Sequence, residues 1–121
     1  MLDKNVSELL NTQINKEFYS AYLYLDFANY YKDQGLDGFA NWYNVQAQEE
    51  RDHAMLFIQY LQNNSEKISL ESIDKPDKVF DAFDQPLHAS LEHERYVTSL
   101  IHNIYDAAYT VKYFYNKVVL H

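Results

Sequence analysis

The sequence contains no cysteine, and this absence excludes several kinds of protein. Without cysteine there is no disulfide framework, no thiolate metal site and no cysteine nucleophile, so we expect a cytoplasmic protein rather than a secreted disulfide scaffold. Glycine and proline are scarce, with two of each, which disfavours a sheet-rich fold with many tight turns. No apolar run reaches the roughly 18 residues of a membrane span, and the N-terminus lacks the apolar core of a signal peptide. We therefore expect no membrane partner.

The chain has 121 residues and a formal net charge of −8. This length suits a single domain covering residues 1–121. The negative charge disfavours a nucleic-acid partner and leaves cations as candidate partners. Aromatic residues are dense, with twelve Tyr, seven Phe and one Trp. Such rings can build a core, but a buried tyrosine needs a hydrogen-bond partner for its hydroxyl group.

Apolar residues recur at steps of three and four in three stretches, a pattern typical of amphipathic helices. The first stretch contains Val6, Leu10, Ile14, Ala21, Tyr24, Ala28 and Tyr31, the second Phe39, Tyr43, Ala47, Ala54, Phe57 and Leu61, and the third Phe83, Leu87, Leu91, Val97, Ile101, Ile104 and Ala108. The sequence therefore predicts an all-α fold with three long helices, followed by a short C-terminal segment.

The two connections between these stretches predict how the helices are arranged. Gly35 is expected to end the first helix in the left-handed conformation and Asp37 to cap the second, so that the two are antiparallel neighbours. The second connection, about residues 65–78, is polar and contains Pro76. Its roughly 14 residues can span about 46 Å, more than the roughly 40 Å of a 27-residue helix. We therefore expect an up-down bundle with one long crossover, whose third helix starts late or is kinked at Pro86.

Each apolar stripe is interrupted near its middle by one carboxylate: Glu17, Glu50 and Glu94. A carboxylate on a buried face is costly unless it is paired, and a shared divalent cation would pair all three. His53 lies three residues after Glu50 and therefore on the same helix face. Its imidazole suits iron or zinc better than calcium. This pattern is typical of di-iron bundles; the alternatives are a salt-bridged core group and an ordinary solvated face.

Two further residues have open roles. Tyr24 lies about two turns after Glu17 on the same face. Its role is that of a hydrogen-bond donor, a redox-active phenol or an ordinary core residue. Glu49 points to a neighbouring surface of the same helix. It is either an auxiliary metal ligand or a surface charge. The remaining histidines have no carboxylate at a convincing ligand spacing, and we expect them at the surface or at an interface; they are His88, His93, His102 and His121.

Three segments resemble bacterial non-haem ferritins in both residues and spacing: Glu17–Tyr24, Gln48–Ala54 and Glu92–Glu94. The resemblance covers about residues 1–108. It implies a ferritin-like four-helix bundle with a di-iron ferroxidase centre, which oxidises Fe(II) with dioxygen or peroxide. It also implies iron storage as ferric mineral inside a hollow homo-oligomer of 24 subunits.

The resemblance also implies roles for particular residues. The implied iron ligands are Glu17, Glu50, His53 and Glu94, with Tyr24 as the site tyrosine and Glu49 as a ligand of a third, weaker iron site. The haem-containing relatives carry Met directly after the bridging glutamate. Arg51 stands at that place here, so no haem is expected.

The resemblance is lost over residues 109–121. After Asp106 there is no Asp or Glu, and the tail contains the apolar and aromatic runs Tyr113–Tyr115 and Val118–Leu120. We expect a chain truncated before the family's fourth helix, with a second iron site that lacks its fourth-helix carboxylate. The open apolar faces of three helices would favour association, with a neighbouring chain covering them.

Two alternatives to a ferroxidase remain open from the sequence. The first is a catalytically impaired helical module that binds one metal ion or none. The second is another di-iron enzyme, such as a rubrerythrin-like peroxidase, although the absence of cysteine excludes a rubredoxin-type iron site in this chain.

Overall fold

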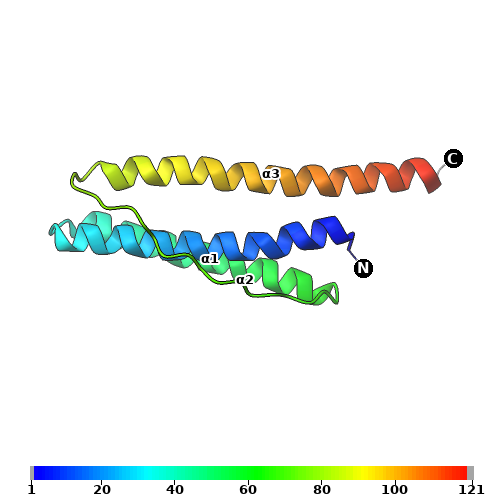
Figure 1. Ribbon diagram of the computed structural model, residues 1–121, viewed down its shortest axis with the longest axis horizontal. Coiled ribbons are helices and arrows are strands. Elements are labelled where there is room, and N and C mark those ends of the chain that lie inside the picture. Colours follow the sequence, from blue (N-terminus) through cyan, green and yellow to red (C-terminus); the bar gives the residue numbers. More distant parts are fainter. Residues whose placement is uncertain (1, 120–121) are drawn as a thin grey trace.

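Three long helices make up the part of the chain that the structure describes, and Figure 1 shows how they are arranged. The computed structural model describes residues 2–119, and the side chains of residues 2–111. Helix α1 spans Lys4–Asp33, α2 spans Asp37–Asn63 and α3 spans Gln85–Val119, and no strand forms within residues 2–119. Helix α2 runs back along α1, and α3 runs parallel to α2 (Figure 1). The predicted all-α, up-down bundle with one long crossover is therefore confirmed.

The turn between α1 and α2 depends on one glycine. Gly35 has a φ of 72°, the left-handed conformation in which a residue with a side chain is strained, and it ends α1 as expected. The predicted cap at Asp37 is wrong, because the turn places Leu36 at the N-cap and Asp37 inside the first turn of α2. Asp37 instead pairs with Lys32, at 3.0 Å between Nζ and Oδ1.

The long crossover, residues 64–84, is fixed to α1 by asparagine side chains. Asn11 donates to the carbonyl of Ser69 (3.0 Å) and accepts from its N–H (2.9 Å), and Asn15 donates to the carbonyl of Ser72 (2.9 Å). The crossover returns the chain to the end of the bundle where α2 begins (Figure 1). Pro86 lies in the first turn of α3, where proline is well tolerated, so this helix starts late.

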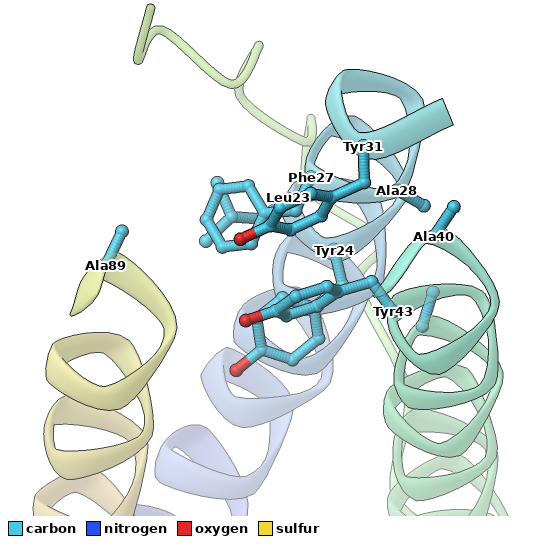
Figure 2. Packing of buried hydrophobic residues seen from close by; sticks show 9 residues of the cluster. Leu23, Tyr24, Phe27, Ala28, Tyr31, Ala40, Tyr43 and Ala89 are labelled. Atoms are coloured by element: carbon cyan, nitrogen blue, oxygen red, sulfur yellow. The ribbon is translucent and has the colours of Figure 1, made fainter. Parts of the chain in front are cut away.

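Two apolar clusters form the core. One is built around the rings of Tyr24, Phe27, Tyr31 and Tyr43 (Figure 2). The other, towards the opposite end of α1, consists of Val6, Leu10, Ile14 and Leu61. Glu17 follows Ile14 by one turn and precedes Tyr24 by two, so the stretch of α1 that carries it lies between the clusters.

The stripe predicted for the third helix is only partly buried. Val97 is buried, whereas Leu91 and Ile101 are exposed and Phe83 precedes the helix. The reason is that the backbones of α2 and α3 both approach α1 and not each other, so one face of α3 has no helix against it in the described part of the chain. The expected short C-terminal segment continues α3 as far as Val119. The side chains of Tyr113–Tyr115 and Val118–Leu120 lie outside the described residues.

Within residues 2–119, no helix is both long and apolar enough to span a membrane.

Candidate metal centre

Glu17 of α1 and Glu50 and His53 of α2 converge between the two clusters. Their ligand atoms all lie within 4.8 Å of one another. His53 Nδ1 is 3.9 Å from Glu17 Oε2 and 3.6 Å from Glu50 Oε2. Both carboxylates are buried, at 1 % and 6 % exposure, while the histidine side chain is about half exposed. The group is therefore buried on its acidic side and open to solvent on its imidazole side.

Glu17 is held in place by a residue that the sequence reasoning missed. The side chain of Gln13, one turn earlier on α1, is buried and donates to Glu17 Oε1 at 2.9 Å. Its position four residues before Glu17 was the available signal. Glu17 Oε2 is buried and has no hydrogen-bond partner among the described residues. An orphaned carboxylate oxygen is costly, and a bound cation would supply its missing partner.

The surroundings of Glu50 change its ionisation. Burial raises the pKa of Glu50 to about 9, and a side-chain hydrogen bond with Glu17 and then the charges of Glu17, Glu94 and Glu49 act in the same direction. At neutral pH the metal-free Glu50 therefore holds a proton. A metal ion must displace that proton to bind, so metal binding depends on pH.

Glu94 lies near this group but is not one of its members. It is exposed on α3, and its carboxylate accepts a hydrogen bond from the hydroxyl of the buried Tyr24. The pKa of the Tyr24 phenol is raised, mainly by burial and then by this hydrogen bond. Tyr24 is thus both a core residue and a hydrogen-bond donor. Glu49 is exposed and also lies outside the group, so the ligand roles of Glu94 and Glu49 stay predictions.

His93, which we expected at the surface or at an interface, faces α1. Its side chain is half-buried, and its Nε2 is 2.7 Å from Ser20 Oγ of α1. Burial, chiefly, lowers the pKa of its imidazole. Spacing from carboxylates could not reveal this role, because the partner of His93 is a hydroxyl group on another helix. His88 and His102 are exposed as expected, and His121 lies outside the described residues.

A protein-family model described as "Ferritin-like domain" matches residues 7–115 of this chain. The chain belongs to the ferritin family. The matched region continues past residue 108, where we expected the resemblance to end.

Curated ferritins and solved ferritin structures are similar to this chain. The bacterial non-heme ferritin of Campylobacter jejuni is 35% identical over 112 residues, which are 93% of this chain and 67% of the relative. A probable bacterial non-heme ferritin-like protein of Haemophilus influenzae is 32% identical over 112 residues, which are 93% of this chain and 68% of that relative. The structure of an open pore ferritin from Archaeoglobus fulgidus matches with a TM-score of 0.89 and 37% identity, over 99% of this chain and 74% of that one.

This ferritin chain therefore spans about two thirds of the length of the curated relatives it matches. Within that length it carries two carboxylates and one imidazole in a single group. Carboxylate and imidazole together suit divalent first-row transition metals, iron among them. The buried Glu17 oxygen without a partner fits a site that is completed by a cation.

Proposed function

We propose that this chain takes part in iron storage by oxidising Fe(II) to Fe(III) at a di-iron centre formed by Glu17, Glu50, His53 and Glu94. The observation that carries the proposal is the buried pair of carboxylates beside His53, with one oxygen of Glu17 lacking a partner. Membership of the ferritin family supports iron as the metal.

The residues of the centre divide the work between two substrate ions. Glu17 and His53 bind the first Fe(II), Glu94 binds the second, and Glu50 lies between them and releases its proton as the ions enter. The two ions give up one electron each. Dioxygen accepts these two electrons together with two protons and leaves as hydrogen peroxide, while the hard carboxylate oxygens favour the Fe(III) product. Tyr24 orients Glu94 through its hydroxyl group.

Three other features of the proposal concern what surrounds the centre. Glu49, on the exposed side of α2, binds a third iron that enters later. The exposed apolar face of α3 is covered in a homo-oligomer, since such a face favours association. With Arg51 after the bridging glutamate, the chain holds iron without haem.

Stopped-flow measurement of Fe(II) oxidation tests the centre. We expect Glu50→Ala to abolish the rapid phase, because this variant removes the carboxylate shared by both ions. Glu49→Ala, on the exposed side of the same helix, should keep the initial rate and slow later turnovers. A normal initial rate in a folded Glu50→Ala variant, with helix content checked by circular dichroism, would rule out this centre.

A second candidate function is that of a helical module that binds one metal ion without rapid oxidation. It is favoured by the composition of the group, which brings together Glu17, Glu50 and His53 but not Glu94. An anaerobic Fe(II) titration separates the two. Two ions per chain support the di-iron centre, whereas one ion per chain supports the module.

A further inference from the structure

Side chains on one face of α3 bond to the other two helices near the metal centre. Ser90 Oγ lies 2.7 Å from the hydroxyl of Tyr43 on α2, while His93 and Glu94 bond to Ser20 and Tyr24 on α1. These α3 residues are three and four positions apart and therefore share one face. Polar contacts thus join α3 to both other helices near the centre, in addition to its buried apolar residues Ala89 and Val97.

The direction of the bond between His93 and Ser20 follows from the surroundings of the serine. The Ser20 hydroxyl donates to the carbonyl of Lys16 at 2.8 Å, so its one proton is already used. With that proton on Lys16, both bonds form when His93 Nε2 carries a hydrogen and donates it to Ser20 Oγ. Because Ser20 is fully buried, no water can replace this donor, and its loss would leave the serine oxygen with an acceptor site unfilled.

The same imidazole ring packs against the tyrosine that holds Glu94. The rings of His93 and Tyr24 meet edge to face, with centroids 5.9 Å apart and planes at 84°. A second edge-to-face contact joins His93 to Tyr19, at 5.9 Å and 60°. Tyr24 in turn donates its hydroxyl to Glu94. His93 therefore contacts α1 one turn away from the hydrogen bond that fixes the exposed Glu94 carboxylate.

We propose that His93 is a positioning residue of the metal centre. By donating to Ser20 and packing against Tyr24, it holds this part of α3 against α1 and keeps the Glu94 carboxylate at the Tyr24 hydroxyl, close to Glu50. The inference rests on the proposed function in one respect, the role of Glu94 as a ligand of the second ion. His93 itself binds no metal and acts through its neighbours.

An anaerobic Fe(II) titration of the full chain tests the effect on the metal. Loss of a residue that orients a ligand typically weakens metal binding 10- to 100-fold. We expect His93→Leu to weaken the second ion about 10-fold and to leave the first ion, at Glu17, Glu50 and His53, unchanged. His93→Gln, which keeps a side-chain N–H donor, should restore the second ion. His88→Leu, an exposed histidine on the same helix, is the matched control.

Two outcomes of the titration would overturn the proposal. An unchanged second ion in His93→Leu would show that the Glu94 carboxylate is held without His93. Equal weakening of both ions would show that the substitution loosens the bundle as a whole.

A second experiment is independent of any metal. In a double-mutant cycle on the metal-free chain, followed by urea unfolding, Tyr24→Phe should cost less in the His93→Leu background than in the parent. We expect a coupling of about threefold or more in the unfolding constant, whereas simple additivity would overturn the proposal. His93→Asn, whose shorter amide cannot reach Ser20, replaces His93→Leu should the latter not fold. If the parent binds fewer than two ions, the proposed di-iron function fails, while the cycle still decides whether His93 holds the Tyr24–Glu94 pair.

Discussion

The substitution Glu50→Gln should stabilise the metal-free chain although it removes a proposed ligand. The carboxyl group has a pKa of about 9 in the folded chain, against an ordinary value of 4.5. At pH 7 the folded state therefore keeps a proton that the unfolded state has lost. Each pKa unit corresponds to about 1.4 kcal/mol, so the 2.5 units between 4.5 and 7 set an upper limit of about 3.5 kcal/mol. Water on the open side of the group screens part of this, and we expect about 1 to 2 kcal/mol.

The sign of the pH dependence is part of the prediction. Because the pKa of Glu50 is higher in the folded than in the unfolded chain, the folded state binds more protons between pH 4.5 and pH 9. The free energy of unfolding of the parent must then fall as the pH rises through this window. A glutamine at position 50 does not titrate. The stability advantage of Glu50→Gln should therefore be small near pH 4.5 and increase towards pH 9.

Urea unfolding of both chains at pH 5 and pH 8, in the presence of a chelator, measures this difference. Glu49→Gln is the matched control, because it removes an exposed carboxylate one residue away and should leave the free energy of unfolding within about 0.5 kcal/mol of the parent. A Glu50→Gln chain that is less stable than the parent at pH 8, or whose advantage does not change with pH, would refute the reasoning. The same variant should bind Fe(II) more weakly.

Two other substitutions test the surroundings of the site and the turn. Gln13→Met keeps the side-chain volume but leaves Glu17 Oε1 without its hydrogen-bond donor. Urea unfolding should show a free energy of unfolding lower by about 1 to 3 kcal/mol. Gln48→Met, at an exposed position, is the control, and an equal loss in both variants would contradict the role of Gln13. In Gly35→Ala the added methyl group meets open space, but the alanine backbone must adopt a φ of 72°. Thermal melts should show a free energy of unfolding lower by about 1 kcal/mol. Unchanged stability would contradict the need for glycine in this turn.

The fold was predictable because local signals agreed with one another. The helical period placed α1 and α2, Gly35 predicted their turn, and the length of the polar connection predicted that α3 runs parallel to α2. The burial of α3 was not predictable in the same way. Leu91 and Ile101 continue the apolar period of this helix, yet they are exposed. Periodicity shows which face of a helix is apolar and not whether another helix lies against that face.

The candidate site was predictable where spacing within one helix decides the geometry. Glu50 and His53 are three residues apart, and the carboxylate of Glu17 interrupts the stripe that faces them. The supporting residues were not predictable in this way. The bond from His93 to Ser20 joins two helices whose register is set by packing along their whole contact, so the separate patterns of α1 and α3 contain no information about it.

The position of the carboxylates between two apolar clusters explains both the instability and the proposed affinity of the centre. The rings of the Tyr24 and Tyr43 cluster on one side and the aliphatic side chains of the Val6 and Leu61 cluster on the other exclude water from Glu50, which raises the free energy of its charged form. A cation that binds only the folded chain recovers this energy and stabilises the fold by mass action. In the proposed centre, iron binding and folding are therefore coupled through the buried carboxylates. For this reason we expect Glu50→Gln to raise the free energy of unfolding of the metal-free chain and to reduce the additional stability that bound iron provides.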